Sequence, residues 1–162
     1  MDQRMLSVVM PAYNEAENIY TNIGKVIHAL NNFTENYEII AVNDGSTDQT
    51  KREIMKAVRD YDQVKIVSYK KNRGKGNAIK EGVKASSGTY IAFLDADLDL
   101  PPEQLGAYLK CLKNDKADVV IGSKMHKDSQ INYPFVRKVI SFCYYCMLKV
   151  LFRLNVHDTQ TG

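Results

Sequence analysis

The sequence has few cysteines, no long apolar run and little net charge, and each shortage excludes a class of protein. Its three cysteines among 162 residues cannot all pair, so they form no disulfide framework and indicate a reducing compartment. The apolar stretch at residues 5–10 is too short for a secretory signal, and no uninterrupted apolar run approaches a membrane span. The net charge of +3 is too small to argue for a nucleic-acid binder.

The remaining composition is that of a globular domain. Hydrophobic residues make up 44% of the chain and charged residues 25%, and the length suits one domain with its own core. The sequence contains no repeat, low-complexity segment or evident linker. We therefore expect residues 1–162 to form a single domain.

Short apolar runs alternate with segments of helical periodicity. The runs that predict strands are 6–10, 39–42, 64–67, 90–94 and 119–121. The predicted helices cover 19–30, a segment with Ile54 and Val58 on its apolar side, 74–85, and the residues after Pro101-Pro102. We expect Asn14 to cap the first helix, Ser46 and Thr47 to cap the second, and Gly76, Ala78 and Gly82 to permit close packing of the third. This βαβαβαβαβ order predicts an α/β fold, with a parallel sheet covered by helices on both faces.

Polar motifs follow three of the predicted strands. They occupy residues 11–15, 43–46 and 95–99. In a parallel α/β sheet, ligands bind beyond the carboxyl ends of the strands. The three motifs therefore predict a binding site at that edge of the sheet.

The third motif has the composition of a divalent-cation site. Asp95, Asp97 and Asp99 alternate, so in an extended segment their side chains point to one side. Mg²⁺ or Mn²⁺ suits one or two carboxylates together with the oxygens of a phosphorylated substrate. A solvated acidic turn is the alternative interpretation. An EF-hand is excluded because Leu100 and Gly106 stand where its loop needs glycine and glutamate, and no Walker A motif is present.

Five segments in a fixed order resemble a known family. They are residues 7–15 (SVVMPAYNE), 42–48 (VNDGSTD), 72–76 (NRGKG), 95–97 (DAD) and 158–162 (DTQTG). Together they resemble the family 2 glycosyltransferases of GT-A fold, in particular the polyprenyl-phosphate (dolichyl-phosphate) mannosyl- and glucosyltransferases. The resemblance covers essentially the whole chain, and it implies a Rossmann-like, mostly parallel sheet.

The resemblance also implies roles for individual residues. Those implied to bind the nucleotide sugar are Pro11, Tyr13, Glu15, Val42, Asp44, Asp95, Ala96 and Asp97. Asp97 and Asp99 are implied to hold Mg²⁺ or Mn²⁺ against the diphosphate, although many relatives carry Gln at the position of Asp99. Each side chain also has a structural interpretation on its own: Tyr13 can be a packing aromatic, Asp44 a turn residue and Glu15 a first-turn carboxylate.

The implied reaction is the inverting transfer of a hexose, as in GDP-mannose or UDP-glucose, to a polyprenyl phosphate. The anionic acceptor needs no strong base, and Lys124 and Arg137 are implied to hold it. A saccharide hydroxyl as acceptor would need a base, for which Asp158 is the best candidate. The alternatives are therefore a transferase acting on a saccharide hydroxyl, a non-catalytic nucleotide-sugar-binding domain, and a metal-dependent phosphatase.

Residues 136–154 predict a basic, aromatic and amphipathic helix. Such a helix suits the surface of a membrane, near a polyprenyl substrate, and a core helix is the alternative. We expect peripheral contact with the cytoplasmic face of a membrane through this segment. Family members are longer than this chain, so we expect a catalytic domain truncated at its C-terminus.

Overall fold

The computed structural model describes residues 5–114 and 117–122. The chain divides into two compact units, Met1–Lys116 and Ala117–Gly162, and the helices and strands below belong to the first. Lys124, Arg137, Asp158 and the segment 136–154 lie outside the described residues. Their roles, and the extent of the domain, stay predictions.

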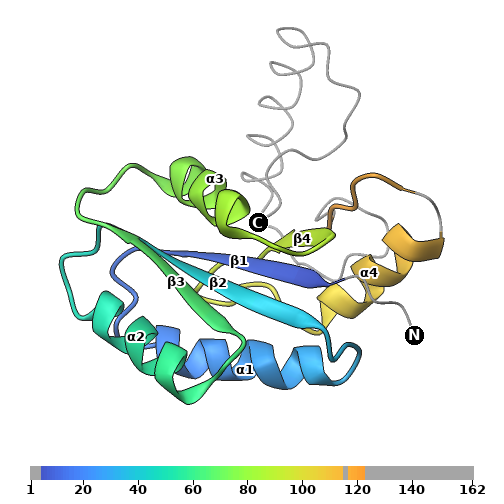
Figure 1. Cartoon of the computed structure of the whole chain (residues 1–162), viewed down its shortest axis with the longest axis horizontal. Coiled ribbons are helices and arrows are strands. Elements are labelled where there is room, and N and C mark those ends of the chain that lie inside the picture. The colour runs from blue at the N-terminus through green and yellow to red at the C-terminus, as the bar shows by residue number, and fades with distance from the viewer. Residues whose placement is uncertain (1–4, 115–116, 123–162) are drawn as a thin grey trace, which may run out of the picture. The chain divides into compact units, whose positions relative to one another are not determined.

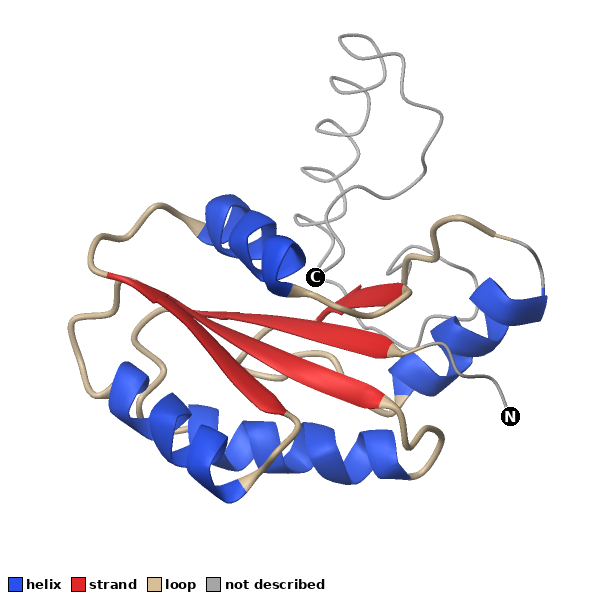
Figure 2. Cartoon of the chain, in the orientation of Figure 1, coloured by secondary structure: helices blue, strands red, loops and turns tan. Residues whose placement is uncertain are grey.

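The first unit contains a four-stranded sheet in which every strand pair is parallel (Figures 1 and 2). Its strands are β1 (Leu6–Ala12), β2 (Tyr37–Asp44), β3 (Val64–Tyr69) and β4 (Tyr90–Phe93), in the order β3-β2-β1-β4. The helices are α1 (Ile19–Asn31), α2 (Thr50–Asp60), α3 (Lys75–Ala85) and α4 (Gln104–Asn114). This arrangement confirms the predicted α/β class and four of the predicted strands.

The fifth predicted strand is not formed. Residues 119–121 belong to no strand, and Val119 and Ile121 are 76% and 52% exposed. An inner strand buries both of its faces, whereas this segment buries neither of these side chains. The prediction of a strand here was wrong.

The two faces of the sheet are covered by different helices. Successive strand residues point to opposite faces, so Val8 and Ile39 join the larger core cluster while Val9, Ile40 and Val42 join a smaller one. Helices α1 and α2 lie on one face and α3 on the other (Figure 1). Right-handed crossovers require this change of face, because α1 and α2 lead toward β3 while α3 leads back past β1 to β4.

Close packing of α3 depends on one glycine. A Cβ atom on Gly82 would overlap the side chain of Val9 and lie 3.1 Å from Cγ2 of Val42. The prediction of close packing is therefore confirmed at Gly82. It is not confirmed at Gly76, where a Cβ atom would meet nothing within 4 Å.

A buried carboxylate joins the amino ends of the strands. Glu38 of β2 accepts hydrogen bonds from the Ser7 hydroxyl (2.6 Å), the Ser87 backbone N–H (2.6 Å) and the Lys65 ammonium (2.6 Å). Burial raises the pKa of Glu38, but these hydrogen bonds outweigh burial and hold it below its ordinary value of 4.5. Gly88 N–H also donates to the Ser7 hydroxyl. Glu38 therefore ties three strands to the loop before β4.

We expect Glu38→Gln to lower the free energy of unfolding by about 1–3 kcal/mol at neutral pH, because hydrogen bonds to a charged acceptor are lost. A carboxylate whose pKa is lowered on folding stabilises the protein above its unfolded pKa and loses that effect as pH falls through the folded value. The difference between wild type and variant should therefore shrink below pH 4.5. Urea denaturation at several pH values measures it, with Glu35→Gln, an exposed carboxylate, as the control. A difference that does not change with pH would contradict the role of the charge.

No helix in the described part of the chain is long and apolar enough to span a membrane.

Candidate functional site

A cavity of about 390 Å³ lies beyond the carboxyl ends of the strands. Seven of the eight residues predicted to bind a nucleotide sugar line it: Pro11, Tyr13, Glu15, Asp44, Asp95, Ala96 and Asp97. The eighth, Val42, is fully buried in the core cluster on the α3 side of the sheet and does not line the cavity. The structure thus brings together residues that are up to 86 positions apart in the sequence, from Pro11 to Asp97.

The loops after β1 and β2 are joined by hydrogen bonds that fix one wall of the cavity. The Asn14 backbone N–H donates to the Ser46 hydroxyl (3.1 Å), and the Thr47 N–H donates to Oδ1 of Asn14 (2.9 Å). Asn14 has a positive φ of 56°, a conformation that asparagine tolerates better than most residues. The bonds hold the segment that carries Tyr13 and Glu15 against the end of β2.

These bonds correct the predicted helix caps. Asn14, Ser46 and Thr47 cap no helix: α1 begins at Ile19 and α2 at Thr50. Asp48 joins the loops instead, since it accepts the N–H groups of Ala16 (3.1 Å) and Thr50 (2.9 Å). Asn14, Ser46 and Thr47 have side chains that could cap a helix, but here they form hydrogen bonds between the two loops.

The Asp44 carboxylate is held at the end of β2. Its Oδ1 atom accepts the Tyr69 hydroxyl (2.6 Å) and the Arg73 backbone N–H (2.9 Å). The next residue, Gly45, has a φ of +65°, and its Cα lies so close to the backbone of Lys71 and Asn72 that a Cβ atom would overlap it. The end of β2 and the loop after β3 therefore form one tightly packed wall.

On the other side of the cavity, the loop after β4 is held by two different contacts. The Asp95 carboxylate forms an ion pair with the Lys75 ammonium (2.7 Å), which extends from the first residue of α3. The carbonyl oxygen of Ala96 accepts the buried side-chain amide of Asn22 (2.9 Å). Residues 95–97 are thus fixed from both α1 and α3.

Negative charge is concentrated at the cavity. Burial raises the pKa of Glu15 above its ordinary value of 4.5, and the negative charges of Asp97 and Asp48 raise it further. Asp97 is exposed, and its Oδ1 atom accepts the backbone N–H of Asp99 (3.2 Å). A bound cation would relieve this repulsion between carboxylates.

The oxygen ligands present fit a hard divalent cation that is completed by substrate. In the described ranges, no group of three or more His, Cys, Asp or Glu side chains converges to enclose a metal ion. Mg²⁺ does not need such an enclosure, because it keeps several waters and binds one or two carboxylates together with substrate phosphates. Asp97 lines the cavity, whereas Asp99 does not, so the structure brings only one of the two predicted ligands to the wall.

Five lining residues were not predicted: Ala12, Asn72, Gly74, Lys75 and Ala78. Three of them belong to the NRGKG segment, which carries part of the family resemblance but contains no residue predicted to bind the nucleotide sugar. The sequence feature that could have indicated these lining residues is the basic run of Lys70, Lys71, Arg73 and Lys75 directly after β3. Only Lys75 of these four lines the cavity, and local sequence does not distinguish it from its neighbours.

The fold and the site define a class of protein: a doubly wound α/β domain with an acidic, loop-built cavity at the carboxyl edge of its sheet. The chain belongs to glycosyl transferase family 2, whose family description matches residues 7–160.

Sequence identity to individual relatives supports membership of this family. The chain is 36% identical to a dolichol-phosphate mannosyltransferase of Pyrococcus furiosus over 84% of its own length and 38% of that protein. It is 31% identical to the dolichyl-phosphate beta-glucosyltransferase of Mus musculus, over 98% of its own length and 53% of that protein. The chain thus spans about half or less of the length of these relatives.

Solved structures share the fold. The mannosyltransferase PcManGT from Pyrobaculum calidifontis, in complex with GDP-Man and Mn²⁺, has a TM-score of 0.60 at 25% identity, over 72% of this chain and 33% of that one. Glucosyl-3-phosphoglycerate synthase from Mycobacterium tuberculosis has a TM-score of 0.68 at 22% identity, over 98% of this chain and 55% of that one. Both comparisons confirm the predicted GT-A architecture.

Proposed function

We propose that this domain transfers a hexose from a nucleoside diphosphate sugar to a polyprenyl phosphate, with inversion at the anomeric carbon. The observation that supports it best is the convergence of seven predicted donor-binding residues on one cavity. The names of the relatives from Pyrococcus furiosus and Mus musculus support a hexose as the transferred group and a polyprenyl phosphate as acceptor. The GDP-Man bound to the mannosyltransferase from Pyrobaculum calidifontis supports the donor class.

The wall beside β2 suits the nucleoside. Asp44 is a carboxylate held in one orientation, and as an acceptor it would take an N–H group of the base. Tyr13 is 46% exposed beside it in the cavity lining, where its ring can contact the base or ribose. Pro11 and Glu15 complete this part of the wall.

The opposite side suits the diphosphate. We propose that Asp97, with Asp99, holds Mg²⁺ or Mn²⁺ there; when bound, the cation would neutralise the charge that develops on the leaving diphosphate. Lys75 adds a positive charge to the same cavity, although in this structure it is paired with Asp95. The chain's own contribution is therefore mainly to position the donor and balance its charge.

The acceptor side of the proposal rests on residues outside the described part of the chain. A lipid phosphate is already an anion at neutral pH, so Lys124 and Arg137 would position it and no strong base would be needed. Residues 136–154 would contact the cytoplasmic surface of the membrane that carries it. With a saccharide hydroxyl as acceptor, Asp158 would instead take the proton.

A ligand screen tests the donor class. We expect a GDP-, UDP- or dTDP-sugar, together with Mn²⁺ or Mg²⁺, to raise the free energy of unfolding by about 2.7 kcal/mol at 100 times its dissociation constant. Thermal-shift measurements on the chain detect this, with the sugar nucleotide alone and the metal alone as controls. No shift with any donor would overturn the proposal.

Product analysis tests the acceptor. With the binding donor, the chain should glycosylate a short polyprenyl phosphate and not the corresponding polyprenol, which carries a hydroxyl in place of the anion. Transfer to a saccharide hydroxyl instead would favour the alternative acceptor. Donor binding without transfer to either acceptor would support a non-catalytic nucleotide-sugar-binding domain.

A further inference from the structure

Asp44 has a structural partner on the neighbouring strand that the sequence did not indicate. Tyr69 is the last residue of β3, and in the parallel pairing of β2 with β3 it stands directly beside Asp44. Its hydroxyl donates to Oδ1 of Asp44 at 2.6 Å, and the Arg73 backbone N–H donates to the same oxygen. Among the residues that the structure describes, only these two groups bind the Asp44 side chain.

Tyr69 is itself held on three sides. Its ring packs, partly buried, against the core cluster of Val9, Ile40, Val42 and Ala78. The Arg73 guanidinium lies 5.4 Å from the ring centroid, and the Asn77 side-chain amide donates to the Tyr69 hydroxyl (3.3 Å). A tyrosine fixed in this way presents its hydroxyl to Asp44 in one direction.

The electrostatics keep Tyr69 a donor. Burial raises the pKa of Tyr69, and the hydrogen bond to Asp44 raises it further. The hydroxyl therefore keeps its proton throughout the physiological pH range. Asp44 accepts the hydrogen bond from the Tyr69 hydroxyl through Oδ1. The second carboxylate oxygen of Asp44 accepts no hydrogen bond within the described residues.

We propose that Tyr69 is a positioning residue that fixes the Asp44 carboxylate for recognition of the nucleobase, so that part of the affinity for the donor depends on a residue outside the cavity wall. This inference rests on the proposed function. Without the Tyr69 hydroxyl, Asp44 would keep only the Arg73 N–H and would have to be ordered when the ligand binds, which lowers affinity. Tyr69 does not line the cavity, so it acts through Asp44 and not by contact with the ligand.

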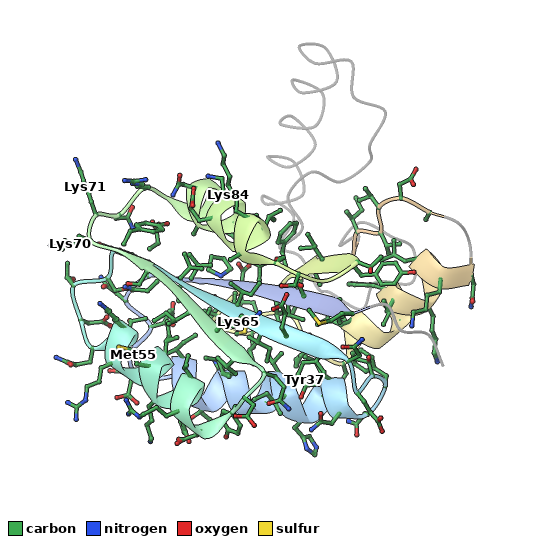
Figure 3. All side chains as sticks on the ribbon, in the orientation of Figure 1. Tyr37, Met55, Lys65, Lys70, Lys71 and Lys84 are labelled. Carbon is green, nitrogen blue, oxygen red and sulfur yellow. The ribbon has the colours of Figure 1, made fainter. Side chains whose placement is uncertain are left out.

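The test is calorimetry on the full chain with GDP and UDP, each with Mn²⁺, and with inorganic pyrophosphate and Mn²⁺. For the nucleoside diphosphate that binds wild type, we expect Tyr69→Phe to weaken affinity roughly tenfold, the size of one hydrogen bond to a charged group. Pyrophosphate has no base, so its affinity should not change. The matched control is Tyr37→Phe, which removes a hydrogen bond to Asn31 at the opposite end of the sheet from Lys70 and Lys71 (Figure 3) and should alter neither affinity.

A double-mutant cycle separates positioning from general support of the fold. If Tyr69 acts through Asp44, then Tyr69→Phe should have almost no effect on affinity in an Asp44→Asn background. Equal loss in both backgrounds, equal loss for pyrophosphate, an unaffected Tyr69→Phe protein or one that does not fold would each overturn the inference. Wild type that binds neither GDP nor UDP, and shows no thermal shift with any donor of the ligand screen, would overturn the proposed function as well, so the two failures are distinguishable.

Discussion

Asp97→Ala is expected to abolish the metal-dependent part of nucleotide binding. Among the carboxylates that line the cavity, Asp97 is the predicted metal ligand, and its side chain is exposed to solvent. With Mn²⁺ and a nucleoside diphosphate at 100 times its wild-type dissociation constant, the stabilisation of about 2.7 kcal/mol should disappear. In EDTA, wild type and variant should behave alike.

The variant should fold, because removing Asp97 removes repulsion. The charge of Asp97 is one of the causes, after burial, that raise the pKa of Glu15, so its loss favours the ionised form of Glu15. Asp62→Ala, an exposed aspartate on the turn before β3, is the control and should bind like wild type. Asp99→Ala shows whether the second predicted ligand contributes. Unchanged metal-dependent stabilisation in Asp97→Ala would remove Asp97 from the site.

The inner strands β1 and β2 could be predicted from the sequence because their apolar runs are buried on both faces. Ile39, Ile40, Ala41 and Val42 are all fully buried. An unbroken apolar run of this kind is the sequence pattern of a strand that is covered on both faces. The run at 119–121 is also made of β-branched apolar residues, yet it forms no strand. Composition reports a tendency to pair and does not report the partner.

The site could be predicted where its residues follow strands directly. Asp44, Asp95 and Asp97 lie in this position, and parallel topology brings them to one edge. Tyr69 and Lys75 could not be found in this way, since their importance comes from the register of β3 with β2 and from the path of the loop into α3. The predicted helix caps were wrong for a related reason. The side chains of Asn14 and Ser46 suit a helix start, but in the fold these two residues join the loops after β1 and β2 by a hydrogen bond.

Gly45→Ala is expected to have the largest effect on stability of any single substitution considered for this wall. Two costs add at this position. The φ of +65° is unfavourable for a residue with a side chain, and the new Cβ atom would overlap the backbone of Lys71 and Asn72, which cannot move aside as a flexible side chain can. We expect a loss of about 3 kcal/mol or more in the free energy of unfolding, measured by urea denaturation.

Two glycines of the NRGKG segment after β3 separate the two costs. Gly74 has a φ of +86° but open space around it, so Gly74→Ala should show the conformational cost alone, about 1–3 kcal/mol. Gly76 has open space and lies inside α3, so Gly76→Ala should stabilise the protein by about 0.4–1 kcal/mol. A Gly45 variant no less stable than the Gly74 variant would show that the loops after β2 and β3 are not tightly packed. Because that contact holds Asp44 beside Asn72, Gly45→Ala should also weaken binding of a nucleoside diphosphate more than binding of pyrophosphate.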